Sequence, residues 1–323
     1  MKLLGLEMRG FADQKNCKVL SRLLIRCTVS CIFVFVAQFA LSAVPRFFPA
    51  SSLLTHLALS VLVLLAVVGF GRCIKRLLGV RASAPALVFF NVLFIWGVYM
   101  AVVRQAISPL MDIIFNGELV LLIIGLCSIL SSDPGLVSQG SSCFDGLVES
   151  PVTEVEANYE SSDSLRRVRY CRSCNAHIKG FDHHCPAFGN CIGQKNYVLF
   201  MVLLVGFVIT EASYIACSSQ FITEFRILDK TGWEETSLSG NLVVSTMIFS
   251  LLQVLWQGVF LGWHVYCVCF NIKTDEWINW TKYPEFQLPV QPQTGQSFTE
   301  MRFRNPYDKG VLCNVKEFLV PKE

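Results

Sequence analysis

The chain has 323 residues, of which 53% are hydrophobic and 16% are charged. A soluble domain usually carries about 25% charged residues. This composition excludes a disordered protein, a coiled coil and an ordinary soluble α/β enzyme, and it indicates a membrane protein. The formal net charge of +3 is too small to indicate nucleic-acid binding. The 14 cysteines are too few for a disulfide scaffold, and many lie inside apolar runs.

Six apolar segments are candidates to cross a bilayer, which requires about 20 mostly apolar residues in a helix. They are residues 23–44, 53–70, 86–103, 117–130, 197–217 and 241–270. The fourth is short, so four or five spans remain an alternative if the first or the fourth does not cross. A cleaved signal peptide is the alternative for the first segment. The sequence predicts an all-α polytopic membrane protein with about six transmembrane helices.

The placement of lysine and arginine predicts how these helices are oriented. Of the 27 basic residues, 22 lie in four segments: residues 1–22, 71–85, 131–195 and 271–323. These segments alternate along the chain with the other three connections between spans, which hold three basic residues in total. Because basic residues accumulate on the cytosolic side, both termini and the 131–195 loop should be cytosolic. The expected organisation is a cytosolic N-terminus (1–22), transmembrane helices one to four (23–130), a cytosolic cysteine-rich domain (131–196), transmembrane helices five and six (197–270) and a cytosolic tail (271–323).

One part of the cytosolic loop, residues 170–197, concentrates side chains that bind metals or act as nucleophiles. A Cys-x-x-Cys pair can supply two corners of a tetrahedral zinc site, and a later histidine and cysteine can supply the others. A redox dithiol is an alternative, but it accounts for none of the histidines. A structural zinc site is favoured, since disulfides are rare in the cytosol. The residues in question are Cys171, Cys174, His177, Asp182, His183, His184, Cys185 and Cys191.

This cluster offers more thiols and imidazoles than one zinc ion needs. The run Asp182-His183-His184-Cys185 also has the parts of a nucleophilic unit. A cysteine can attack, an imidazole can activate the thiol, and a carboxylate can orient the imidazole. These residues therefore predict a loop that zinc stiffens and that carries an activated thiol.

Several motifs in order make the sequence resemble the DHHC protein S-acyltransferases, integral-membrane enzymes that palmitoylate cytosolic cysteines. The resemblance covers about residues 133 to 320, and the first two predicted spans fall outside the four-span core of that family. The motifs are Asp133-Pro134-Gly135, Asp182-His183-His184-Cys185-Pro186, Asn190-Cys191-Ile192-Gly193 with Asn196 and Phe200, Lys273-Thr274-Asp275-Glu276, and Asn305-Pro306-Tyr307-Asp308-Lys309-Gly310 with Asn314 and Phe318.

The resemblance implies a role for each matching residue. Cys185 would be the nucleophile that accepts the acyl group, His183 would activate it, and Asp182 would orient His183. Thr274 would form a hydrogen bond near Asp182, and Asn314 would anchor the tail. One structural zinc ion would be bound by Cys171, Cys174, His184 and Cys191.

Three features depart from the family pattern. The family usually holds two zinc ions, but the upstream cysteine pair of the other site is missing here, so we expect a single ion. His177 stands where the family has a cysteine of that lost site, and we expect it to lie outside the ligand set. Ala187 and Lys273 take the places of a usual tryptophan and threonine. We expect these changes to affect rate and stability more than mechanism.

The implied reaction transfers a long-chain acyl group, typically palmitoyl, from acyl-CoA through acyl-Cys185 to cysteines of target proteins, with ping-pong kinetics. Palmitoyl-CoA, proteins with membrane-proximal cytosolic cysteines and the lipid bilayer would be the partners, and nucleic acid would not. The expected location is an endomembrane, with the Golgi favoured, or the plasma membrane. Candidates for binding the CoA phosphates, or for ordinary positive-inside charge, are Arg166, Arg167, Arg169, Arg172, Lys179 and Lys195.

Two other functions compete with this interpretation. A catalytically weak or inactive zinc-bearing membrane scaffold of the same family is suggested by the missing second metal site, although the intact Asp182, His183 and Cys185 argue against it. A transporter is suggested by the six spans and by the intramembrane Glu211. A transporter would leave the cysteine–histidine loop unexplained.

Overall fold

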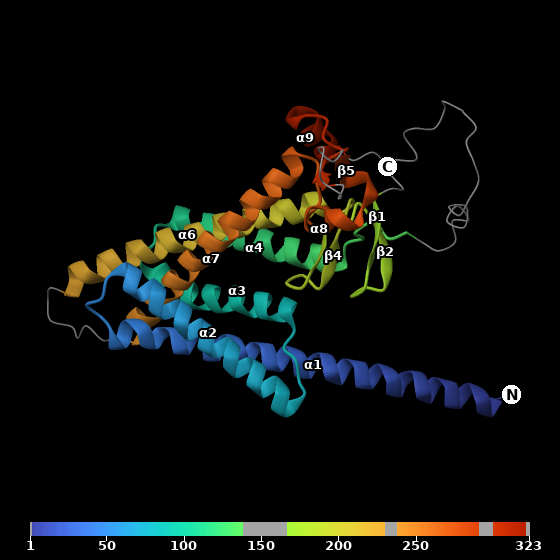
Figure 1. Ribbon diagram of the computed structural model, residues 1–323. Coiled ribbons are helices and arrows are strands. Elements are labelled where there is room, and N and C mark those ends of the chain that lie inside the picture. The colour runs from blue at the N-terminus through green and yellow to red at the C-terminus, as the bar shows by residue number, and fades with distance from the viewer. Residues whose placement is uncertain (1, 138–166, 230–237, 291–299, 321–323) are drawn as a thin grey trace, which may run out of the picture. The chain divides into compact units, whose positions relative to one another are not determined.

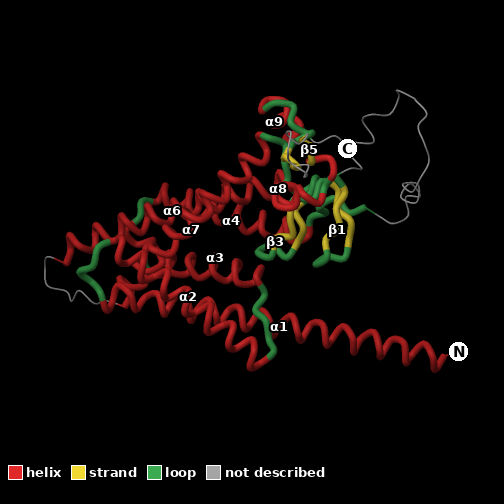
Figure 2. The backbone as a smooth tube through the Cα atoms, in the orientation of Figure 1, coloured by secondary structure: helices red, strands yellow, loops and turns green. Residues whose placement is uncertain are grey.

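The structure, a computed structural model, is mainly helical and describes residues 2–137, 167–229, 238–290 and 300–320 (Figures 1 and 2). The long helices are α1 (Lys2–Phe47), α2 (Leu53–Leu78), α3 (Ala84–Ala101), α4 (Pro109–Ser131), α6 (Tyr197–Asp229) and α7 (Leu238–Cys269). Within the described residues, six helical stretches are long and apolar enough to cross a membrane. The predicted fold class is confirmed.

The fourth span is longer than the sequence indicated. We expected residues 117–130, but α4 begins at Pro109 and has 23 residues. Its first turns contain polar residues that find partners close by. Asp112 accepts hydrogen bonds from the Tyr99 hydroxyl at 3.0 Å and from Arg104 Nε at 3.1 Å. The Asn116 amide also donates to Asp112. Polar residues that are satisfied in this way do not interrupt a membrane helix.

Many apolar side chains on these helices point outward. Leu121, Leu62 and Val259 are 70%, 61% and 71% exposed. An apolar surface of this extent would be unfavourable in water, and it is the surface that a helix presents to lipid. The exposed side chains therefore agree with the assignment of these helices as membrane spans.

The chain divides into two compact units, of which the first comprises residues 1–123 and 208–256. Its core is aromatic. The rings of Tyr99 and Phe115 lie 4.3 Å apart, and those of Phe115 and Tyr214 lie 6.1 Å apart. Contacts between α1 and α3 include a hydrogen bond of 2.8 Å from the Gln38 amide to Asn91. Such buried polar pairs join helices where lipid offers no alternative partner.

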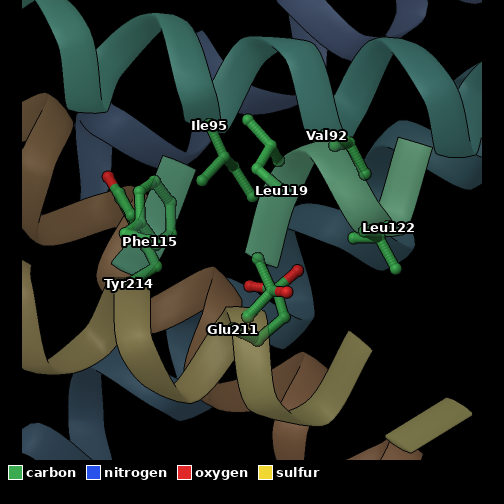
Figure 3. Close-up of a pocket in the computed structure, with 8 residues that line it drawn as sticks. Val92, Ile95, Phe115, Leu119, Leu122, Glu211 and Tyr214 are labelled. Atoms are coloured by element: carbon green, nitrogen blue, oxygen red, sulfur yellow. The ribbon is translucent and has the colours of Figure 1, made fainter. Parts of the chain in front are cut away.

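The first unit also contains a largely apolar pocket in which Glu211 is buried. Figure 3 shows Glu211 on α6 facing Leu119 and Leu122 of α4. The Oε2 atom of Glu211 has no hydrogen-bond partner among the described residues. Glu211 therefore faces protein rather than lipid.

The second unit comprises residues 124–207 and 257–323, and it contains the cysteine–histidine segment. Short elements dominate it. They are β1 (Val168–Cys171), β2 (Ala176–Lys179), β3 (His183–Cys185), β4 (Asn190–Ile192), α8 (Thr274–Asn279), η2 (Trp280–Lys282), η3 (Pro284–Phe286), β5 (Gln287–Val290), β6 (Glu300–Phe303) and α9 (Val311–Leu319). The strands form three antiparallel hairpins, β1–β2, β3–β4 and β5–β6.

Gly193 follows β4 at a point where the chain passes very close to its neighbours. A Cβ atom on Gly193 would lie 2.3 Å from the carbonyl oxygen of Pro134 and 2.6 Å from Ile178 Cγ2. Only glycine fits here without displacing backbone. The backbone at Gly193 therefore lies directly against both the segment after α4 and the β1–β2 hairpin.

Gly193→Ala should therefore destabilise the second unit by about 1–3 kcal/mol, the usual cost of overpacking. Thermal unfolding in detergent would measure the effect. Gly258→Ala on α7 is the matched control, because a Cβ atom there would meet nothing within 4 Å. Equal melting temperatures for the two variants would contradict the proposed close packing.

Candidate metal centre and nucleophilic site

The β3–β4 hairpin separates two sets of side chains. Successive residues of a strand point to opposite faces, whereas directly paired residues point to the same face. His184 pairs with Cys191, so these two share a face. His183 and Cys185 flank His184 on β3 and therefore point to the other face. Three consecutive residues thus serve two sites.

The first face carries the predicted zinc ligands. The sulfur of Cys174 lies 3.3 Å from the sulfur of Cys191 and 3.4 Å from Nδ1 of His184. The Cys191 sulfur lies 3.6 Å from the same nitrogen. With Cys171, the four ligand atoms all lie within 4.8 Å of one another. Zinc–ligand bonds of about 2.0–2.3 Å in a tetrahedron require separations of roughly 3.3–3.8 Å, so the set can hold one zinc ion.

The electrostatics of this set also favour a cation. Burial, and then hydrogen bonds with the other thiols, raise the pKa of Cys191 well above its ordinary value. A thiolate at this position therefore needs a positive partner. Burial and the neighbouring His183 lower the pKa of His184, which favours the neutral imidazole that binds metals.

The β1–β2 hairpin presents the cysteine pair. Cys171 is the last residue of β1 and pairs with Ala176 of β2. Cys174 lies in the turn that connects β1 to β2. Asn175 closes this turn with a φ of 54°, a left-handed conformation that asparagine adopts more readily than most residues. His177 is not among the four grouped ligand atoms of the described residues.

The second face carries the predicted nucleophile. His183 Nδ1 lies 2.7 Å from Asp182 Oδ2, and the Asp182 side chain is fully buried. Cys185 is buried as well, whereas the His183 side chain is 21% exposed. Asp182 directly precedes β3, and His183 and Cys185 lie on it. A buried carboxylate, an imidazole and a thiol thus occur together, as in sites that activate a thiol.

The carboxylate and the imidazole stabilise each other's charged forms. Burial alone would raise the pKa of Asp182, but the hydrogen bond and charge of His183 outweigh it and lower that pKa. Burial alone would lower the pKa of His183, but interactions with Asp182 and then Cys185 raise it. His183 is thus a stronger base than a free imidazole, which suits a group that removes a thiol proton.

The segment after α7 holds Asp182 in place through backbone groups. The Thr274 N–H donates to Asp182 Oδ1 at 2.9 Å, and the Asp275 N–H donates to the Asp182 carbonyl at 3.0 Å. Thr274 therefore contacts Asp182 through its main chain. Its hydroxyl instead accepts a hydrogen bond of 3.2 Å from the Trp263 indole.

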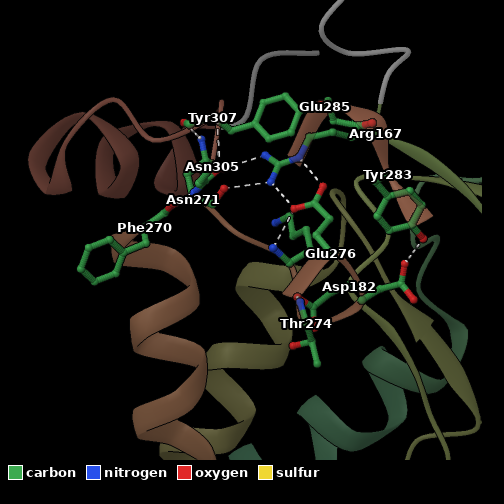
Figure 4. A network of polar contacts seen from close by, with 12 residues as sticks. Arg167, Asp182, Phe270, Asn271, Thr274, Glu276, Tyr283, Glu285, Asn305 and Tyr307 are labelled. Atoms are coloured by element: carbon green, nitrogen blue, oxygen red, sulfur yellow. Dashed lines mark hydrogen bonds and ion pairs between the residues drawn. The ribbon is translucent and has the colours of Figure 1, made fainter. Parts of the chain in front are cut away.

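A buried polar network around Arg167 connects the start of the cysteine-rich segment to the C-terminal motifs (Figure 4). The Arg167 guanidinium donates to both carboxylate oxygens of Glu276, at 2.7 and 2.6 Å, and to the side chain and carbonyl of Asn271. It also lies 4.0 Å above the Tyr307 ring. Glu276 in turn accepts the Lys273 N–H at the start of α8. The network fixes α8 next to Asp182.

Glu276→Gln should be strongly destabilising, because the substitution removes the negative charge that compensates the buried Arg167 guanidinium. The Arg167 and Glu276 side chains are only 14% and 2% exposed, and breaking such a pair typically costs about 3–5 kcal/mol. Glu317→Gln is the control, since its pair with Lys309 is 39% and 54% exposed and should contribute at most about 1 kcal/mol. Thermal melting of both variants tests the comparison, and a similar small shift for both would contradict it.

Asn314 on α9 holds the tail against the end of α7. The fully buried amide donates to the Cys269 carbonyl at 2.8 Å and to Asp308 Oδ1 at 2.7 Å. Its oxygen accepts the Lys309 N–H at 3.0 Å. These contacts connect α9 to the end of α7 and to the Asp308 turn.

Three of the predicted phosphate-binding residues are occupied by other contacts. Arg167 binds Glu276, Arg169 lies 2.6 Å from Glu285, and Lys195 lies 2.8 Å from Asp133. Their positions in the sequence suggested a positively charged surface that could bind phosphate. In the structure, each of these three side chains instead forms an ion pair with a carboxylate. Arg166 lies outside the described residues.

The structure also places His264 and Tyr197 beside Asp182, which the sequence did not predict. His264 Nδ1 lies 4.0 Å from Asp182 Oδ2 and 3.0 Å from the Tyr197 hydroxyl. Asp182, His183 and His264 form a second group of closely spaced metal-ligand atoms. Asp182 and His183 are hydrogen-bonded to each other within this group, whereas the Cys₃His group has the ligand types and spacing that suit zinc.

Comparison with known proteins agrees with this geometry. The model of the DHHC palmitoyltransferase family matches residues 160–281, which include both faces of the β3–β4 hairpin. Residues 160–281 therefore resemble the DHHC palmitoyltransferase domain. The resemblance predicted from the motifs is therefore confirmed, and the matched DHHC domain extends from before β1 into η2.

Relatives of the DHHC domain occur in animals and plants. The chain is 28% identical over 137 residues to palmitoyltransferase ZDHHC18 of Rattus norvegicus, a match that covers 41% of this chain and 34% of that protein. It is 27% identical over 158 residues to probable protein S-acyltransferase 3 of Arabidopsis thaliana, covering 48% and 32%. It is 26% identical over 178 residues to palmitoyltransferase ZDHHC7 of Mus musculus, covering 52% and 56%. The chain thus spans between a third and somewhat over half of the length of these relatives.

Proposed function

We propose that the protein is a protein S-acyltransferase that moves a long-chain acyl group, typically palmitoyl, from acyl-CoA to cysteine thiols of other proteins. The observation that carries this proposal is the position of Cys185 beside the paired His183 and Asp182, on the strand face opposite to the metal ligands. The DHHC domain match and the S-acyltransferase names of its relatives support the same activity.

The reaction has two stages, and each conserves atoms and charge. His183 takes the proton of the Cys185 thiol, and the thiolate sulfur attacks the thioester carbon of acyl-CoA. The new carbon–sulfur bond forms as the bond to the CoA sulfur breaks, and His183 returns the proton to that leaving sulfur. A thiol of the acceptor protein then loses its proton to His183 and attacks acyl-Cys185. Its attack releases the free Cys185 sulfur, which takes up the proton.

The residues Cys171, Cys174, His184 and Cys191 would hold one structural zinc ion. All four positions of a tetrahedral ion are then filled by protein, so the ion supplies rigidity and no open site for a substrate. Rigidity at β3 keeps Cys185 and His183 in register with each other, where small displacements cost large factors in rate.

The membrane position of the site follows from the chemistry of its substrate. Burying each methylene of an acyl chain gains about 0.8 kcal/mol, so the chain should insert among the spans. Tyr197 begins α6 only twelve residues after Cys185, which supports a position of the thiol near the membrane interface. We further propose that the DHHC segment and both termini face the cytosol, in a Golgi or other endomembrane or in the plasma membrane.

Release of CoA provides the test. Purified, zinc-loaded protein in detergent should release about one CoA per chain in a rapid burst when palmitoyl-CoA is added without an acceptor, as expected for a covalent intermediate. A cysteine-containing acceptor peptide should then restore turnover. Folded, zinc-loaded protein that releases no CoA would contradict the proposal and favour the scaffold alternative.

A further inference from the structure

A second histidine lies next to the catalytic carboxylate. His264 is on α7 and its side chain is fully buried. Its Nδ1 atom lies 4.0 Å from Asp182 Oδ2, the same oxygen that lies 2.7 Å from His183 Nδ1. The two imidazole rings are 5.7 Å apart between centroids and tilted by 36°. Asp182 is therefore approached by imidazoles from two different elements.

Packing fixes the orientation of His264. Phe200 and Phe260 make edge contacts with its ring, at centroid distances of 4.8 and 4.6 Å. Among the residues that the structure describes, the ring forms one hydrogen bond, between Nδ1 and the Tyr197 hydroxyl at 3.0 Å. Tyr197 is itself held between the Lys273 ammonium, 4.3 Å from its ring centroid, and the ring of Phe318 at 5.3 Å. An imidazole enclosed in this way has little freedom to rotate.

The hydrogen bonds also indicate which nitrogen carries the proton. The Nε2 atom of His264 is buried and has no partner among the described residues. An unpaired buried N–H is rarer and costlier than an unpaired acceptor. The proton therefore belongs on Nδ1, where the N–H dipole points toward the Tyr197 oxygen and the Asp182 carboxylate.

This dipole helps to compensate the negative charge of the Asp182 carboxylate. The Asp182 carboxylate is fully buried and stays ionised only if nearby groups compensate its charge. His183 forms a hydrogen bond with one carboxylate oxygen, and the Thr274 N–H donates a hydrogen bond to the other. His264 adds a fixed positive dipole end at 4.0 Å, which is too far for proton transfer and close enough to bias how the carboxylate turns.

We propose that His264, held by Tyr197, is a positioning residue that keeps Asp182 oriented toward His183; this inference rests on the proposed acyl transfer. His264 does not touch the reacting atoms. Its removal lets the carboxylate rotate, which misaligns His183 with Cys185 and slows the formation of acyl-Cys185. Binding of acyl-CoA should change little.

Single-turnover acylation by palmitoyl-CoA tests the proposal in the full-length, zinc-loaded protein. His264→Ala should lower the acylation rate by about 10- to 100-fold, the usual effect of losing a group that orients a functional residue, with the KM for palmitoyl-CoA within about twofold. His264→Gln, whose amide can still donate, should recover most of the rate. His56→Gln is the matched control, because His56 is another buried membrane histidine with an unpartnered Nε2.

A double-mutant cycle with Tyr197→Phe separates positioning from a general structural effect. Tyr197→Phe should slow acylation when His264 is present. In the His264→Ala background it should reduce the acylation rate hardly any further, because both substitutions disrupt the same hydrogen-bonded pair. If His264→Ala does not fold, His264→Gln and Tyr197→Phe decide the question through their rates alone.

The proposal is overturned if His264→Ala acylates at the wild-type rate, if it changes only the KM, or if the two losses simply add. Wild-type protein that forms no acyl-enzyme would overturn the proposed function instead, so the two failures are distinguishable.

Discussion

Replacing Cys185 with serine should reduce acyl-enzyme formation by at least about a thousandfold, as loss of a catalytic nucleophile does in other covalent enzymes. The substitution changes one atom at a buried position next to His183. A hydroxyl group is far less acidic than a thiol, so the same base cannot generate a comparable nucleophile. The β3–β4 pairing and the metal ligands on the other strand face stay unchanged.

The measurement is the incorporation of labelled palmitate that neutral hydroxylamine removes, because hydroxylamine cleaves thioesters. Zinc content should remain one ion per chain in the serine variant, which shows that the fold is intact. Cys269→Ser is the control, since Cys269 is a partly buried cysteine near the end of α7 and should leave the acylation rate near that of the wild type. Equal labelling of Cys185→Ser and wild type would refute the assignment of the nucleophile.

The second large effect is expected from removal of the metal. Cys191→Ala deletes the ligand that is both completely buried and paired with His184 across the hairpin. Structural zinc contributes about 10–16 kcal/mol of apparent binding free energy in small zinc domains. Because β3 and β4 have only three residues each, their pairing cannot replace that contribution. The hairpin should therefore unfold locally, and acylation of Cys185 should be lost along with the zinc.

Metal analysis and limited proteolysis would measure this effect together with acylation. Zinc should fall from one ion per chain to nearly none, and the segment from β1 to β4 should become sensitive to protease. Cys313→Ala is the control, because Cys313 is exposed and belongs to no ligand group among the described residues. A zinc-free Cys191→Ala protein that acylates normally would contradict a structural role for the ion.

Much of this molecule could be predicted from its sequence because the relevant patterns are local. Apolar segments of sufficient length predicted the membrane helices, and the spacing of Cys171 and Cys174 indicated a group of side chains that could hold a metal ion. The alternation of side chains along a strand then explains how His183, His184 and Cys185 divide between two sites. Nothing about these features requires knowledge of distant contacts.

The features that the sequence did not predict depend on contacts between distant segments. Arg167 and Glu276 are 109 positions apart, and their pairing changes Arg167 from a candidate phosphate ligand into a buried structural residue. His264 and Tyr197 are separated by 67 positions. Polar residues in a membrane helix can serve packing or function, and only the position of Asp182 distinguishes these alternatives. The early start of α4 likewise depends on partners for Asp112 outside that helix.

The most direct test of the account is to map the acyl group and count the zinc in the same sample. Wild-type protein would be quenched with acid after a short reaction with palmitoyl-CoA, and its cysteine peptides would be analysed by mass spectrometry while the metal of an unquenched aliquot is measured. The account predicts an acyl thioester on Cys185, no acyl group on Cys171, Cys174 or Cys191, and one zinc ion retained per chain. An acyl group on one of those three cysteines, or release of zinc as Cys185 becomes acylated, would contradict it.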